Sequence, residues 1–168
     1  MQRIAVWGTG NMGSTAIRSA VGFPGLKLSA VITSSPDKAG RDAAEFAKLD
    51  AQSGVTATTD VDAALEASDA VAYMASGDIR PEEALADIER CLRAGKHVVT
   101  PSLYSLYDPA SAPTEWVDRL RAAAEEGSAG LRVGGVLALG GLAHGQVVGP
   151  FAHAGGKGGR TFSAGFSK

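Results

Sequence analysis

The sequence predicts an α/β protein built around a doubly wound parallel sheet. Short apolar runs alternate with segments whose apolar residues recur at helical spacing, and this alternation continues from residue 4 to residue 136. A glycine pattern typical of a strand-to-helix turn follows the first run, at 8–13. Strands that alternate with helices imply right-handed crossovers and a parallel sheet that is covered on both faces. We therefore expect a Rossmann-type domain at 1–136 and an irregular, glycine-rich tail at 137–168.

The pattern of each segment gives the elements of this domain in order. Six apolar runs have the length of strands, at 4–7, 26–33, 55–57, 70–75, 97–100 and 131–136. Five segments with apolar residues three or four positions apart have the pattern of helices, at 11–21, 41–48, 61–65, 81–92 and 114–126.

Residues at the ends of these segments support the expected boundaries. Thr59 and Asp62 resemble a capping box before the third helix, and Pro81 fits the first turn of the fourth. Gly95 and Gly127 are well placed to end the fourth and fifth helices. The sixth strand then completes the domain near residue 136.

The composition is that of an ordinary globular protein. The 168 residues are 45% hydrophobic and 20% charged with a net charge of -2, so we expect one domain with at most part of another. Without a basic excess or an apolar stretch long enough to span a bilayer, we expect neither a nucleic-acid nor a membrane partner. The single cysteine, Cys91, is expected in the core. It favours a reducing compartment, and with no leader-like N-terminus we expect a cytoplasmic protein.

The last part of the chain differs from the rest. Residues 127–168 hold 13 of the 22 glycines and none of the 18 acidic residues. Glycine-rich polar segments bury too little apolar area to offset chain entropy, so a flexible tail is one interpretation. A truncation or a shifted reading frame is the other.

The G-x-G-x-x-G pattern at the start of the chain follows a predicted strand and opens a predicted helix. In a dinucleotide-binding turn, the first glycine permits the tight bend and the second lets the backbone approach a pyrophosphate. The third lets the helix pack on the strand. The helix N-terminus then offers free N–H groups to the phosphates. We predict that a cofactor is bound by Gly8, Thr9, Gly10, Asn11, Met12 and Gly13; a glycine turn without a ligand is the alternative.

The end of the second predicted strand selects between NAD and NADP. An Asp or Glu at this place bonds the ribose 2′-hydroxyl of NAD, whereas a 2′-phosphate needs hydroxyl groups and cations. The sequence offers Ser34 and Ser35, followed by Lys38 and Arg41, while Asp37 fits a helix start. We expect NADP in preference to NAD. An exposed helix face is the alternative role for the two cations.

The fourth and fifth predicted strands end in residues that could face the reacting part of a cofactor, because ligands bind beyond the carboxyl ends of such strands. Ala75 and Ser76 are small enough to let the backbone approach a cofactor. Tyr104, Tyr107 and Asp108 lie in a loop from which a substrate could be reached, with an ordinary polar connection as the alternative. No spacing of ligand residues predicts a metal site.

Three stretches of the chain resemble the N-terminal domain of the dihydrodipicolinate reductase family: IAVWGTGNMG at 4–13, SSPDKAGRD at 34–42 and AGKHVVTPSLY at 94–104. They are most similar to its branch related to diaminopentanoate dehydrogenase and the native amine dehydrogenases, over about residues 1–135. The resemblance implies an NAD(P)-dependent oxidoreductase that transfers hydride between a nicotinamide and a small imine or amine substrate. It also implies a homo-oligomer and a following α+β substrate domain.

The chain departs from the family pattern where that second domain begins. The family resembles itself in a turn of the Asp-Pro-Gly type, whereas residues 134–150 here are GGVLALGGLAHGQVVGP. No catalytic residue of the second domain has a match, so we assign none. A catalytically incomplete NAD(P)-binding module, either a fragment or a partner-dependent subunit, is therefore the alternative function.

Overall fold

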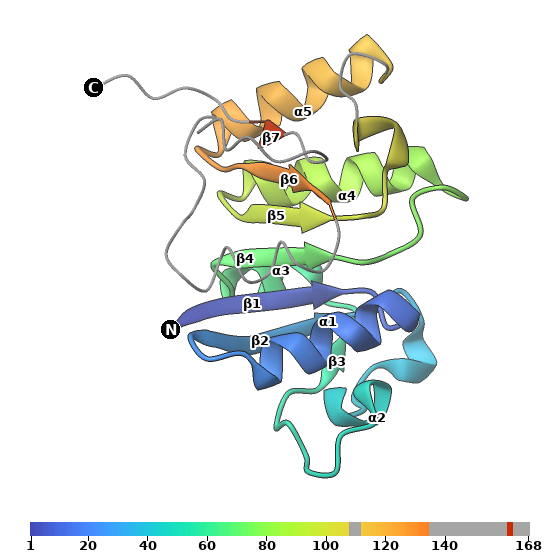
Figure 1. Cartoon of the computed structure of the whole chain (residues 1–168), viewed down its shortest axis with the longest axis vertical. Coiled ribbons are helices and arrows are strands. Elements are labelled where there is room, and N and C mark those ends of the chain that lie inside the picture. Colours follow the sequence, from blue (N-terminus) through green and yellow to red (C-terminus); the bar gives the residue numbers. More distant parts are fainter. Residues whose placement is uncertain (108–111, 135–160, 163–168) are drawn as a thin grey trace.

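The computed structural model describes residues 1–107 and 112–134 and the backbone of 161–162. Within these residues, seven strands form one sheet in the order β3-β2-β1-β4-β5-β6-β7 (Figure 1). They are β1 Gln2–Trp7, β2 Leu26–Ile32, β3 Ala57–Thr58, β4 Ala70–Tyr73, β5 His97–Thr100, β6 Leu131–Val133 and β7 Thr161–Phe162. The pairs from β3 to β6 are parallel, and β7 runs antiparallel to β6. The predicted doubly wound parallel sheet is confirmed.

The strand β7 falls in the tail expected at 137–168, where the sequence pattern indicates no strand. Two residues are too few to show a hydrophobic period, so only the pairing with β6 reveals it. The rest of the tail, and the domain boundary expected at 136, lie outside the described residues.

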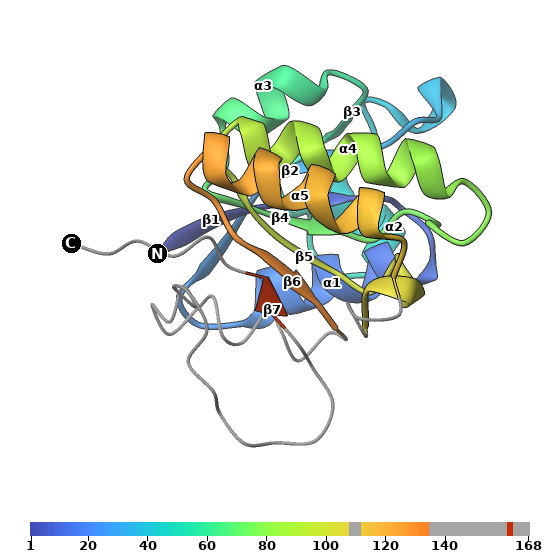
Figure 2. The ribbon, with the colours of Figure 1, turned by 90° about the horizontal axis from the view of Figure 1, so that it is seen from above.

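The helices cover both faces of the sheet, as Figure 2 shows. The described residues contain α1 Asn11–Gly22, α2 Ala43–Ala47, α3 Val61–Glu66, α4 Pro81–Arg93 and α5 Thr114–Glu126. Side chains of α1 and α2 share one hydrophobic cluster with the sheet, and those of α3, α4 and α5 share the other. Two short 3-10 helices, η1 Pro36–Lys38 and η2 Tyr104–Tyr107, lie in segments expected to be loops. Because both faces are covered, strands such as β4 are buried at every residue.

One expected boundary is wrong. The N-cap of α3 is Asp60 and not Thr59, because the Asp60 carboxylate accepts a hydrogen bond from the N–H of Ala63 at 3.0 Å. Aspartate is at least as good an N-cap acceptor as threonine, so the later residue takes the position. Pro81 lies in the first turn of α4 as expected, and Gly95, with φ of +74°, directly follows its C-cap.

The strand order reverses at β1, which pairs with β2 on one side and with β4 on the other. The register places Trp7, the last residue of β1, beside Ile32 and Tyr73. The crossover connections leave this point in opposite directions, so they open a crevice at the carboxyl ends of the strands. This edge of the sheet is where a ligand is expected.

Asp42 fixes the loop that connects α2 with β3. One of its carboxylate oxygens accepts hydrogen bonds from the N–H of Ala44 at 2.8 Å, the N–H of Ser53 at 3.0 Å and the Ser53 hydroxyl at 2.8 Å. The other oxygen accepts from the N–H of Gly54 at 3.0 Å. These hydrogen bonds, that of Ala44 first, favour the charged carboxylate and lower the pKa of Asp42 to about 2.

Substituting Asp42→Asn should destabilise the fold in a pH-dependent manner. The unfolded-state pKa of an aspartate is about 3.9, and the folded value is lower. The carboxylate therefore stabilises the fold above about pH 4, and this contribution is lost as the pH falls toward 2. We expect thermal melts followed by circular dichroism to show a variant that unfolds several degrees lower at neutral pH, with a difference that shrinks in acid. Asp50→Asn, at an exposed position of the same loop, is the control; equal effects of the two substitutions would contradict the role of Asp42.

Candidate functional site

A pocket of about 440 Å³ lies at the carboxyl ends of β1, β2, β4 and β5. Its volume is in the range of small-molecule and cofactor sites. It is lined by residues 7–12, 33–35, 38, 74–78, 80, 101–102 and 104. The pocket therefore occupies the place where the reversed strand order leaves the sheet edge open.

Most of the residues singled out from the sequence meet in this pocket. Those that line it are Gly8, Thr9, Gly10, Asn11, Met12, Ser34, Ser35, Lys38, Ala75 and Ser76. Gly13 and Arg41 do not. Gly13 lies behind the turn, and Arg41 pairs with Glu45 at 2.9 Å and lies over the ring of Phe46, with its guanidinium carbon 5.1 Å from the ring centroid.

The three glycines of the turn meet different surroundings. Gly8 has φ of +115°, and an added Cβ would lie 3.0 Å from the backbone N of Ala75 on β4's side of the pocket. At Gly13 an added Cβ would lie 1.9 Å from the carbonyl oxygen of Gly8. At Gly10 it would meet nothing within 4 Å, although Gly10 lines the pocket. Two glycines thus serve packing within the protein, and the third leaves space inside the pocket.

The N-terminus of α1 opens into this space. Gly10 is its N-cap, so no side chain caps the first turn, and that turn contains no acidic residue. The first N–H groups of a helix have no partner within the helix and carry the positive end of its dipole. Asn11 and Met12, whose N–H groups belong to this turn, both line the pocket. The arrangement suits an anionic group.

The β2 end of the pocket carries hydroxyl groups and a cation. Lys38 donates a hydrogen bond from Nζ to the hydroxyl of Thr9 at 3.3 Å, which holds its side chain toward the glycine turn. The N–H of Ser35 donates to the hydroxyl of Thr33 at 3.2 Å. Asp37 does not line the pocket, so no carboxylate of the described residues faces this end.

The other end of the pocket is built by the loops after β4 and β5, which are packed tightly together. At Gly77 an added Cβ would lie 2.1 Å from the carbonyl oxygen of Ser102. The hydroxyl of Ser102 in turn lies 3.4 Å from the carbonyl oxygen of Tyr73, to which it donates. Asp78 and Arg80, just after this contact, also line the pocket.

Several pocket residues were not found from the sequence. Trp7, Asp78, Arg80 and Ser102 have no motif, and the signal available for them was their place just after a strand. Trp7 is nearly buried, and its ring packs on that of Tyr73 with the centroids 5.5 Å apart.

Of the loop after β5, Tyr104 lines the pocket, Tyr107 lies beside it, and Asp108 falls outside the described residues. Cys91 is fully buried, as expected of a core residue.

Two further properties concern the described residues alone. No helix among them is both long and apolar enough to cross a membrane. No group of three or more His, Cys, Asp or Glu side chains among them is placed to hold a metal ion.

Comparisons with known proteins agree with this geometry. Residues 2–102 match the family model described as dihydrodipicolinate reductase, N-terminus. An amine dehydrogenase of Streptomyces virginiae is 53% identical over 132 residues, which are 78% of this chain and 37% of that protein. The chain therefore spans little more than a third of that relative's length.

Solved structures show the same partial coverage. The structure of an amine dehydrogenase from Mycobacterium smegmatis has a TM-score of 0.68 and 26% identity, and the match covers 77% of this chain and 38% of that one. A UDP-N-acetylglucosamine 3-dehydrogenase from Acidithiobacillus ferrooxidans has a TM-score of 0.56 and 25% identity, with 77% and 37% covered.

Substituting Gly13→Ala should destabilise the fold by at least about 2 kcal/mol, because the methyl group would overlap backbone that cannot move without separating α1 from β1. Gly22→Ala, at the other end of the same helix, meets nothing within 4 Å and is the matched control. It should be neutral or stabilising by up to about 1 kcal/mol, since alanine is the better helix former. Urea unfolding measures both; variants of equal stability would show that the contact is not constrained.

Proposed function

Because the chain belongs to the family described as dihydrodipicolinate reductase, N-terminus, we propose that it binds an NAD(P) dinucleotide in the pocket at the carboxyl ends of β1, β2, β4 and β5. The observation that carries this proposal is the open space at Gly10, beside the uncapped N-terminus of α1. A backbone without a Cβ and a set of free N–H groups are what close approach to a pyrophosphate requires. The residues present therefore fit the cofactor.

The chain's own residues would bind and orient this cofactor. The first turn of α1 would hold the pyrophosphate, and the small residues Ala75 and Ser76 would leave room for the nicotinamide. When bound, the nicotinamide supplies hydride chemistry. Trp7 and Met74 would close the pocket against water from the sheet side, since both line it and are nearly buried.

We further propose hydride transfer between the nicotinamide and an imine or amine. The 53% identity to a protein named amine dehydrogenase supports this reaction class. The second candidate is a binding module that lacks activity alone, which is favoured by coverage of only 37% of that relative. An assay of imine reduction by the purified chain with NADPH separates the two, because the module would bind the cofactor without turning it over.

The β2 end of the pocket supports a preference for NADP over NAD. Ser34, Ser35 and Lys38 line it, and Lys38 is held toward the pocket by Thr9. Hydroxyl groups and a lysine suit a 2′-phosphate, whereas a ribose 2′-hydroxyl is bound by a carboxylate. Arg41 is excluded from this role by its contacts with Glu45 and Phe46.

Substituting Gly10→Ala should leave the fold intact and weaken NADPH binding by at least about tenfold, or 1.4 kcal/mol. The methyl group meets no protein atom but takes space in which the cofactor would lie. Titration followed by energy transfer from tryptophan to NADPH gives the dissociation constant, and circular dichroism checks the fold. Gly22→Ala is the control, and unchanged affinity in Gly10→Ala would refute the assigned position of the cofactor.

Substituting Lys38→Met should weaken NADPH binding by about tenfold and leave NADH binding unchanged, because a charge-assisted contact to a phosphate contributes about 1.5 kcal/mol. The difference should shrink as sodium chloride is added, since salt screens this contact. Lys27→Met, at the opposite end of β2, is the control and should alter neither affinity. Equal losses for NADPH and NADH would assign Lys38 to a part that both cofactors share.

A further inference from the structure

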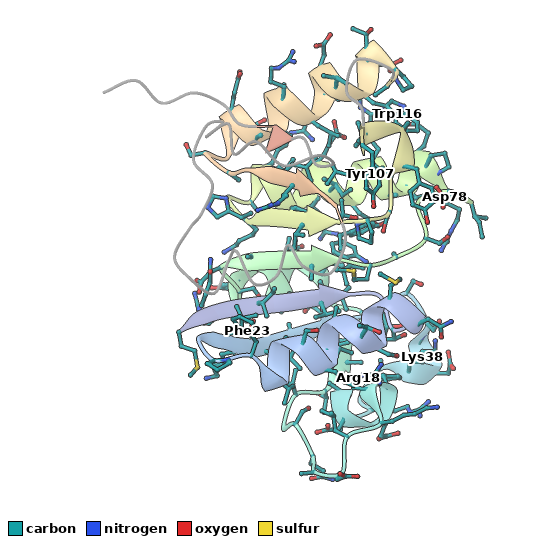
Figure 3. The ribbon with its side chains drawn as sticks, in the orientation of Figure 1. Arg18, Phe23, Lys38, Asp78, Tyr107 and Trp116 are labelled. Atoms are coloured by element: carbon teal, nitrogen blue, oxygen red, sulfur yellow. The ribbon has the colours of Figure 1, made fainter. Side chains whose placement is uncertain are left out.

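The charged side chains that line the pocket are unevenly distributed. Lys38 lies at the β2 end, and Asp78 and Arg80 lie at the end formed by the loop after β4. Figure 3 shows Lys38 and Asp78 on the same edge of the sheet, beyond the carboxyl ends of the strands. Among the described lining residues, Asp78 is the only acid.

Arg80 and Asp78 face different neighbours. Burial raises the pKa of Asp87 on α4, and the positive charges of Arg90 and Arg80 oppose that rise, so Arg80 is close to a carboxylate other than Asp78. Burial also raises the pKa of Tyr107, and Tyr104 and the negative charge of Asp78 add to the increase. The charge of Asp78 is thus directed toward the tyrosines of η2.

These tyrosines form an accessible aromatic pair. The ring centroids of Tyr104 and Tyr107 lie 5.8 Å apart, with the planes inclined by 38°. Tyr104 is 65% exposed and Tyr107 37% exposed, so both rings are available to a ligand. The tight contact of Gly77 with Ser102 holds the loop carrying Asp78 against the segment that leads into η2.

A carboxylate beside aromatic faces is an arrangement that attracts a cation, because the ring quadrupole and the carboxylate both favour positive charge. We propose that Asp78, Tyr104 and Tyr107 recognise the protonated nitrogen of the substrate at the mouth of the pocket. This inference rests on the proposed function, since it places the nitrogen of an amine substrate next to the end expected for the nicotinamide. It assigns the choice of substrate partly to residues of this domain.

The test uses the purified chain with its tyrosine rings labelled with ¹³C and follows ring signals by NMR. The sequence has three tyrosines, and Tyr73, being buried, is an internal reference. We expect n-butylammonium chloride to shift the Tyr104 and Tyr107 signals saturably, and butan-1-ol to bind at least about fivefold more weakly. Ammonium chloride is a second arm; binding of ammonium without n-butylammonium would support the cation site and identify free ammonium as its ligand.

Substituting Asp78→Asn should reduce n-butylammonium affinity to that of butan-1-ol, and Tyr107→Leu should reduce it at least about threefold. NADPH titration of both variants should give the wild-type dissociation constant. Equal binding of the alcohol and the cation, or wild-type affinity in Asp78→Asn, would overturn the inference. Cation binding by a chain that binds no NADPH would instead reject the proposed function and leave the cation site in place.

Discussion

The close approach of α1 to the end of β1 is the constraint on which the rest of the structure depends. The carbonyl oxygen of Gly8 lies where a side chain at residue 13 would begin, so the helix starts as near to the strand as the backbone permits. This contact directs the first turn of α1 to the point where the strand order reverses. The N–H groups of that turn are then surrounded by the ends of β2 and β4. The pocket is therefore a product of backbone packing, and side chains only adjust its chemistry.

The two ends of the pocket differ in charge, and the difference follows from the topology. The segment after β2 contributes Lys38, and the segments after β4 and β5 contribute Asp78, Arg80 and an aromatic pair. Because these strands lie on opposite sides of β1, the cation for a phosphate and the acid for a nitrogen are held apart. A dinucleotide has its phosphorylated ribose and its reactive ring at opposite ends, so this separation matches its shape.

Much of this architecture could be predicted from the sequence because it depends on local patterns. The sheet is covered on both faces, so its strands are short apolar runs, and the glycines of the turn are neighbours along the chain. Arg41 was misplaced because its contact with Glu45 depends on where α2 begins. Trp7 and Asp78 were missed because their place in the pocket results from packing between strands and loops distant in sequence. The strand β7 was missed because a pair of residues carries no period.

The contact at Gly77 has a consequence for how this protein can vary. The loops after β4 and β5 touch through backbone at this residue, and the next one, Asp78, already points away from that contact with an exposed side chain. Sequence drift is therefore confined at one position and free at its neighbour. A library that randomises residues 78, 80 and 104 while keeping 77 fixed would explore new substrates without disturbing the scaffold. Adaptation to a new amine is thus a matter of a few side chains on an unchanged frame.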